Sequence, residues 1–138
     1  MRLARLLPLL LLLAAGAAKA ELACGDLLAG LGKTPAYLVF QGCQAEMGLQ
    51  DQPLVARYRV DGRHALQAER HLQRHYGLPE LKRYCCMWDS TPHSWRDRRT
   101  GVAYMLVMAS GETLVRTRAD WPQIDFFEVS VKAYAHDP

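Results

Sequence analysis

Only one long segment of this chain has helical periodicity, and this constrains its fold most. The apolar residues of segment 62–76 share one helical stripe: Ala65, Leu66, Ala68, Leu72 and Tyr76. Asp61 before this segment is a suitable N-cap, and Gly77 after it is a suitable stop. A second, shorter helical pattern covers Asp26–Leu31. Most of the remaining apolar segments must therefore be explained as strands.

Strand character extends over much of the rest of the chain. The segments concerned are residues 37–43, 54–60, 81–88, 102–108, 113–118 and 124–134. The turn Ser110–Glu112 predicts a hairpin between 102–108 and 113–118, while residues 89–101 are predicted as a polar loop. We therefore expect an α+β domain. Its antiparallel or mixed sheet has about five strands, with the main helix and the short N-terminal helix on one face.

The first twenty residues have the pattern of a secretory signal peptide. Arg2 and Arg5 precede an apolar run from Leu6 to Ala15, and Ala18-Lys19-Ala20 offers a cleavage site. The run is shorter than the roughly 20 apolar residues that a membrane-spanning helix needs. We expect cleavage after Ala20, export to the periplasm, and a single domain over residues 21–138 without stable membrane insertion.

Loss of the leader changes the charge from which function is argued. It removes three basic residues, so residues 21–138 carry 14 basic and 14 acidic side chains. A net charge of zero removes the usual electrostatic reason to expect a nucleic acid partner. A chain of this size forms one domain with a modest core, to which cross-links add stability.

All four cysteines, Cys24, Cys43, Cys85 and Cys86, lie in the part that would be exported. An even number in a small exported domain predicts two disulfides, with three possible connectivities. A bond between Cys85 and Cys86 is the least favoured because it closes a strained ring. We expect these neighbours to point to opposite faces of one strand and to reach Cys24 and Cys43 separately.

Candidate catalytic and metal-binding residues are few. His71 and His75 have the spacing of a metalloprotease helix, but the intervening residues lack its glutamate. Met105 and Met108 suggest copper, yet residues three apart on a strand face opposite sides, so a core role is favoured. Nucleophile-elbow, P-loop and dinucleotide-binding motifs are missing from the sequence. We expect no enzyme activity, cofactor or metal site.

The predicted loop 89–101 offers a recognition surface instead. It places Trp95 among Arg96, Arg98 and Arg99, and aromatic and arginine side chains are enriched at the centres of protein interfaces. The alternative is an ordinary loop with Trp95 folded onto the core. We treat these four residues as the candidate partner-binding site.

Five segments of the sequence carry a family resemblance. They are Cys24-Gly25-Asp26-Leu27-Leu28, Phe40-Gln41-Gly42-Cys43, Ala56-Arg57-Tyr58-Arg59-Val60, Cys85-Cys86-Met87-Trp88 and Phe126-Phe127-Glu128-Val129-Ser130-Val131. Together they resemble a family of small exported proteobacterial proteins catalogued as a domain of unknown function. Some of its members resemble periplasmic immunity proteins that are encoded beside antibacterial lipase effectors of type VI secretion systems. Met87 stands where that family usually has glycine.

The resemblance implies a protein that binds and neutralises a toxic effector, a phospholipase, and it carries over no catalytic residues. A periplasmic carrier of a metal or small ligand is the first alternative, and it requires the histidines or the sulfur atoms to converge. A small hydrolase is the second, and it requires a nucleophile and a base in one cleft. The oligomeric state is left open by the sequence.

Overall fold

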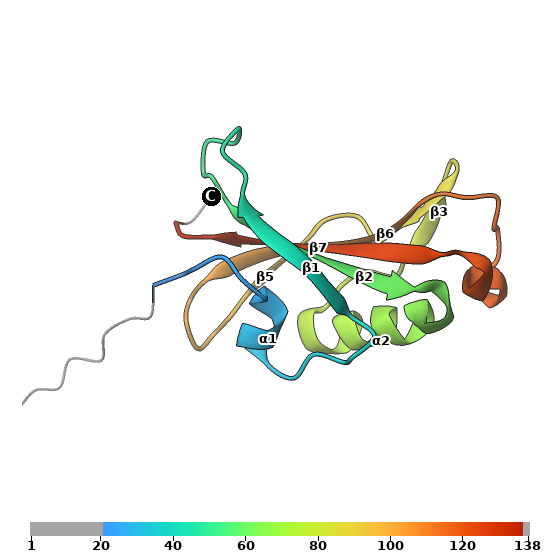
Figure 1. Cartoon of the computed structure of the whole chain (residues 1–138), viewed down its shortest axis with the longest axis horizontal. Helices are drawn as coiled ribbons and strands as arrows, with labels where there is room; N and C mark the ends of the chain where they lie inside the picture. Colours follow the sequence, from blue (N-terminus) through green and yellow to red (C-terminus); the bar gives the residue numbers. More distant parts are fainter. Residues whose placement is uncertain (1–20, 137–138) are drawn as a thin grey trace, which may run out of the picture.

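The computed structural model describes residues 21–136, so the expected leader at residues 1–20 lies outside the described residues. Figure 1 shows one long, twisted sheet with α1 (Leu27–Leu31) and α2 (Ala65–Tyr76) on the same face. The α+β class expected from the sequence is confirmed. In the part of the chain described, none of the helices combines the length and apolarity needed to cross a bilayer.

The sheet has seven strands rather than about five. They are β1 (Val39–Ala45), β2 (Leu54–Asp61), β3 (Lys82–Tyr84), β4 (Met87–Asp89), β5 (His93–Arg96), β6 (Ala103–Glu112) and β7 (Phe126–Tyr134). Their order is β1-β2-β7-β6-β4-β3, and β5 also pairs with β6. Each of these pairings is antiparallel. The strands β1 and β3 therefore lie at opposite edges of the sheet.

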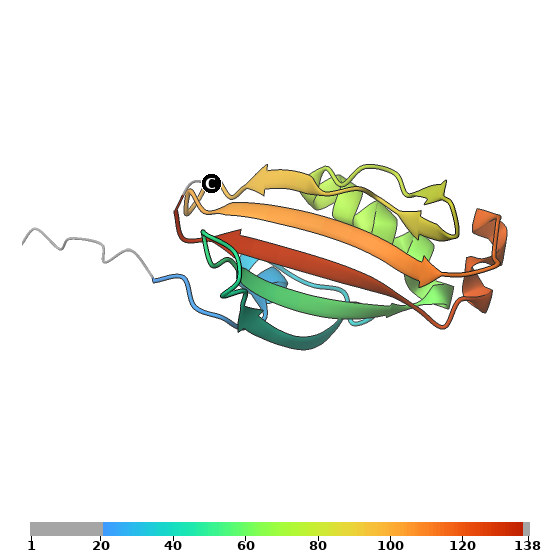
Figure 2. The same cartoon turned by 90° about the horizontal axis from the view of Figure 1, so that it is seen from above.

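Alternation along the central strands separates the two faces of the sheet. On β2, Ala56, Tyr58 and Val60 are fully buried, whereas Arg57 and Arg59 between them are exposed. The buried set packs with the apolar stripe of α2 into one core. Figure 2 views the sheet from its other face, over which no helix of the described chain lies.

The main helix forms as the sequence predicts, with one addition at its start. A 3-10 turn, η1 (Gly62–His64), precedes α2, and the Asp61 carboxylate accepts a hydrogen bond from the Arg63 amide at 2.9 Å. Gly77 ends the helix with a φ of 73°, a left-handed conformation that favours glycine. Gly77 is thus the stop that the pattern predicts, whereas Asp61 caps the 3-10 turn that leads into α2 and not α2 itself.

Three predicted segments are wrong in detail. The predicted strand 81–88 is a hairpin, β3 and β4, whose turn is Cys85-Cys86. The predicted loop 89–101 contains β5. The predicted strand 113–118 does not form; β6 instead runs on to Glu112, and a 3-10 turn, η2 (Arg118–Gln123), follows. Relative to the six predicted strand segments, these differences add two strands and remove one, which gives the seven strands of the sheet.

The segment after β6 is held by side chains instead of by a strand partner. The Arg83 guanidinium donates to the carbonyl oxygens of Thr113 at 2.9 Å and Val115 at 2.7 Å. The Trp88 indole donates to the same Val115 oxygen at 3.0 Å. Because these backbone acceptors are satisfied in this way, the segment needs no pairing in a sheet.

A charge pair between the buried Glu69 and the partly exposed Arg118 fixes α2 to both neighbouring segments. Arg118 donates to both carboxylate oxygens of Glu69, at 2.6 and 3.0 Å, and to the Leu81 carbonyl at 2.6 Å. Glu69 also accepts from the Leu81 amide at 2.8 Å, and its side chain is only 5% exposed. The Arg118 guanidinium lies 4.7 Å from the centre of the Trp121 ring. We call Glu69, Leu81 and Arg118 the clamp.

Candidate functional site

The four predicted partner-binding residues lie at the end of the β5–β6 hairpin. Trp95 and Arg96 belong to β5, and Arg98 and Arg99 lie in the tight connection Asp97–Gly101, which we call the β5–β6 turn. The three arginines are exposed, whereas Trp95 is half-buried. The structure therefore brings the four residues together, on a short hairpin rather than on a long loop.

Trp95 is anchored on the core side of its strand. Its ring meets Tyr76 of α2 edge-on, with centroids 5.0 Å apart, and lies 5.7 Å from the ring of Tyr104. Such aromatic pairs add about 0.5–1.5 kcal/mol beyond the area they bury. The alternative in which Trp95 folds onto the core thus holds in part, because the ring packs on Tyr76 and Tyr104 while the residue stays half-buried.

The β5–β6 turn is a rigid structure built around Asp97. Its carboxylate accepts from the Thr100 hydroxyl at 2.7 Å and from the Arg99 amide at 3.1 Å. These hydrogen bonds, the one from Thr100 first, hold the pKa of Asp97 below its usual range. Gly101 closes the turn with a φ of 77° and donates to the Asp97 carbonyl at 2.7 Å.

Two arginines are oriented by contacts with backbone oxygens. Arg96 donates to the Gly101 carbonyl at 2.7 Å, and Arg99 donates to the Gly30 carbonyl of α1 at 3.1 Å. The Arg99 guanidinium has five N–H donors, so its contact with Gly30 leaves donors for a partner. Arg98 lies exposed between them.

A groove of about 490 Å³ lies on the helix side of this hairpin. The residues that line it are Leu31, Gly32, Lys33, His71, His75, Tyr76, Trp95 and Asp97. The rings of His71 and His75 are 4.4 Å apart. Burial, followed by the positive charges of His75 and Arg74, lowers the pKa of His71. The sequence did not place these histidines beside Trp95, because only the fold brings α2 against β5.

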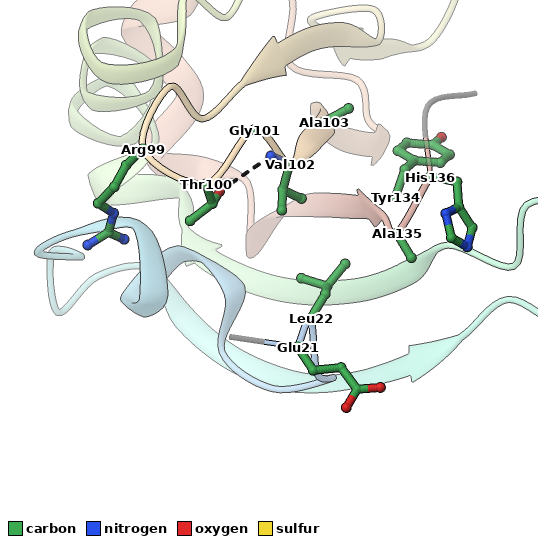
Figure 3. Close-up of a pocket in the computed structure, with 10 residues that line it drawn as sticks. All are labelled: Glu21, Leu22, Arg99, Thr100, Gly101, Val102, Ala103, Tyr134, Ala135 and His136. Atoms are coloured by element: carbon green, nitrogen blue, oxygen red, sulfur yellow. Dashed lines mark hydrogen bonds between the residues drawn. The ribbon is translucent and has the colours of Figure 1, made fainter. Parts of the chain in front are cut away.

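A second hollow, of about 610 Å³, lies on the other side of the β5–β6 turn. Figure 3 shows Leu22 on one side of it and Tyr134 and His136 at its far end, with residues 99–103 forming the wall. The Thr100 hydroxyl accepts from the Val102 amide at 3.3 Å within this wall, and the Arg99 side chain extends toward α1. The turn therefore stands between two concave surfaces.

Among the described residues, the cysteine and histidine side chains do not form a metal site of three or more ligands. Within residues 21–136, no group of three or more His, Cys, Asp or Glu side chains is arranged to hold a metal ion. The predicted core role is confirmed for Met108, which is fully buried, and is wrong for Met105, which is half-exposed on the opposite face of the sheet. The His71 and His75 pair therefore lacks a third protein ligand of these types among the described residues.

The predicted disulfide pattern is wrong in its connectivity. Cys24 and Cys43 are bonded to each other, with Cα atoms 5.6 Å apart, while Cys85 and Cys86 are free thiols. The reason is the strand order, since β1 carries Cys43 at one edge of the sheet and the β3–β4 turn lies at the other. A bond between these edges would have to span the whole sheet.

Comparison with known proteins places the chain in one family. A family described as a domain of unknown function (DUF4952) matches residues 13–88, which is more than half of the 138 residues. The match ends within β4, so the β5–β6 hairpin lies beyond it. No curated protein and no solved structure matches the chain.

Proposed function

Because the chain belongs to this family, whose description assigns no activity, we propose a function from the hairpin and its surroundings. The protein acts as a periplasmic immunity protein that binds and neutralises an antibacterial type VI secretion effector, a phospholipase. Its action is binding rather than catalysis. The sequence resemblance to such immunity proteins supports this proposal.

The observation that carries the proposal is the fixed presentation of arginines at the β5–β6 turn. Asp97 and Gly101 hold the backbone of the turn, and Arg98 lies exposed on it. A turn that is already ordered loses little conformational entropy when it binds, so more of the contact energy appears as affinity. Trp95 beside it supplies apolar area on a rigid ring.

The chemistry of the turn favours an acidic epitope. Guanidinium groups donate paired hydrogen bonds to carboxylates, and such charge-assisted bonds are about twice as strong as neutral ones. An interface of about 1,600 Å² reaches well beyond the turn. The concave surfaces on both sides of the turn provide that additional area. Blocking the effector's substrate entrance would then require no catalysis by the immunity protein.

The proposal expects a phospholipase effector to be encoded beside this chain's gene, and the test uses that effector. We expect the oxidised chain to bind it tightly in titration calorimetry and to abolish lipase activity at equimolar concentration. Arg98→Glu is expected to weaken binding at least tenfold, or about 1.4 kcal/mol. Arg116→Glu is the matched control, because Arg116 is also exposed but lies beyond the far end of β6. Full lipase activity in excess chain would contradict the proposal.

The groove supports a second candidate, a periplasmic carrier of a metal or small ligand. His71 and His75 are in ring contact there, beside Trp95. Calorimetric titration with Zn²⁺ discriminates the two functions. A carrier would bind the ion tightly and lose it on His75→Gln, whereas an immunity protein binds its effector equally well with and without the ion.

A further inference from the structure

The turn of the β3–β4 hairpin consists of two cysteines. Tyr84 pairs with Met87 across it, which leaves only Cys85 and Cys86 to reverse the chain. Two-residue hairpin turns usually carry asparagine and glycine, because they need positive φ values. Cys85 has a φ of 51°, which is uncommon for a residue with a side chain. The thiols therefore occupy a sharply bent backbone at the tip of a hairpin.

The two thiols are in contact with each other. The Cys85 thiol donates to the Cys86 sulfur at a distance of 3.0 Å. Cys85 is exposed, and Cys86 is partly exposed. The chain has four cysteines, and the other two, Cys24 and Cys43, are bonded together. Within one molecule, Cys85 and Cys86 are thus the only partners left for each other.

We propose that Cys85 and Cys86 form a redox-active dithiol that is converted to a vicinal disulfide by exchange with small-molecule or protein disulfides. This proposal rests on two observations at the turn: the two sulfur atoms are in contact, and both thiols are at least partly exposed. It is independent of the immunity function proposed above.

The exchange proceeds in two balanced steps. The Cys85 thiolate attacks one sulfur of the donor disulfide, which releases one thiolate and leaves Cys85 in a mixed disulfide. The Cys86 thiolate then attacks the Cys85 sulfur and releases the second thiolate. The chain loses two electrons and two protons, and one donor disulfide becomes two thiols. An adjacent, contacting second thiol makes the mixed disulfide short-lived.

The exposure of the two sulfurs assigns the order of attack. Cys85 is the more accessible thiol, so a bulky donor disulfide reaches it first. Once Cys85 is ionised, its thiolate accepts a hydrogen bond from the Cys86 thiol; this bond, together with burial and the nearby Glu112 carboxylate, raises the pKa of Cys86. Cys86 is therefore the poorer initial nucleophile and serves as the resolving thiol.

Hydrogen bonds at the end of the turn and on its flanking strands confine the change to the tip of the hairpin. The Cys86 carbonyl accepts from the Thr113 amide at 2.7 Å, and Arg83 on β3 donates to the Thr113 carbonyl at 2.9 Å. On β4, the Trp88 amide donates to the Ser110 hydroxyl at 2.9 Å. These anchors hold both strands, so ring closure is absorbed by the turn backbone and does not unfold the hairpin.

The new bond is expected to be the more easily reduced of the two disulfides. Adjacent Cα atoms are about 3.8 Å apart across a trans peptide, short of the roughly 4.4–6.8 Å usual across a disulfide. Closing the ring therefore strains the turn, and strained disulfides have higher reduction potentials. Cys24 and Cys43 lie 19 residues apart in sequence and carry no such constraint.

The experiment uses the full exported chain in glutathione buffers of graded redox potential. After alkylation of free thiols in denaturant, trypsin releases residues 84–96, which contain both thiols. In oxidising buffer we expect the mass of this peptide to be two hydrogens lower than that of the dithiol form. The peptide should carry no alkyl group and no glutathione. As the buffer becomes more reducing, this bond should open before the Cys24–Cys43 bond does.

Two single variants test the order of attack. Cys86→Ser lacks the resolving thiol and should accumulate glutathione on Cys85, whereas Cys85→Ser should accumulate at least several-fold less on Cys86. Alkylation of both thiols in fully oxidised buffer would overturn the proposal. So would a disulfide joining either thiol to Cys24, Cys43 or a second chain, and so would a bound soft metal ion that protects both thiols without loss of hydrogens.

Discussion

Tryptophan and arginine residues lie near both ends of β6, but the arginines of the two clusters have different partners. At one end, Arg118 of the clamp lies over Trp121. Its guanidinium donates hydrogen bonds to the Glu69 carboxylate and the Leu81 carbonyl. At the other end, Trp95 is anchored while Arg98 on the β5–β6 turn is exposed. The same residue types therefore build a fixed joint in one place and an open surface in the other.

The difference lies in the acidic partner of each cluster. Glu69 is buried and faces the guanidinium of Arg118, whose pKa it raises. Asp97 is also buried, at 9% exposure, but it accepts hydrogen bonds from Thr100 and the turn backbone instead of from an arginine side chain. A carboxylate that orders the turn backbone thus leaves the arginine side chains to face outward.

The largest predicted effect is the loss of the clamp. Arg118→Ala leaves the Glu69 carboxylate buried without its cation, which should lower the free energy of unfolding by about 3–5 kcal/mol. Urea unfolding of the wild type and the variant measures this difference in the free energy of unfolding. Arg57→Ala is the control, because Arg57 and Glu128 form an exposed pair at 47% and 46% exposure, worth about 0–1 kcal/mol. Equal losses in the two variants would erase the distinction between the clamp and a surface pair.

A glycine at each end of the molecule sharpens the comparison. A Cβ at Gly62 would collide with the carbonyl oxygens of Trp121 and Ile124, whereas a Cβ at Gly30 would meet nothing. Gly62→Ala should therefore cost about 1–3 kcal/mol through overpacking. Gly30→Ala, within α1, should gain about 0.5–1 kcal/mol. Thermal unfolding of both variants checks this. A tolerated Gly62→Ala would show that the η2 end is less tightly packed than the contacts indicate.

The sequence predicts the long single elements better than the places where separate elements meet. The α2 stripe and the alternation of β2 are visible because one long element carries each pattern. The clamp is not visible, since Glu69 and Arg118 lie 49 residues apart and meet only through packing. The β3–β4 turn is missed because Cys85-Cys86 lacks the usual turn residues. The groove beside Trp95 requires α2 to lie against β5, which no local pattern encodes.

A smaller effect is predicted for Asp97 in the β5–β6 turn. Asp97→Asn weakens the charge-assisted hydrogen bonds from Thr100 and Arg99, so we expect a loss of about 1 kcal/mol at pH 7. The pKa of Asp97 is lowered on folding, so its contribution is present above the unfolded pKa of about 3.9. It is lost as the pH falls through the folded pKa. Wild type and variant should converge in urea titrations at low pH, and a constant difference would contradict this.

The smallest predicted effect belongs to His71 in the groove. Its pKa is lowered on folding, mainly by burial, so the folded state favours the neutral ring. The stability that it contributes is present above the unfolded pKa of about 6.5 and is lost as the pH falls through that value and the folded pKa. Solvent screening limits the effect to about 0.5 kcal/mol.

His71→Gln should therefore flatten the dependence of the urea midpoint on pH between 7.5 and 5.5. His64→Gln is the control, because His64 stacks on Tyr37 away from the groove. An unchanged slope in His71→Gln would mean that the groove solvates the imidazolium as well as water does, and the turn end would then be open throughout.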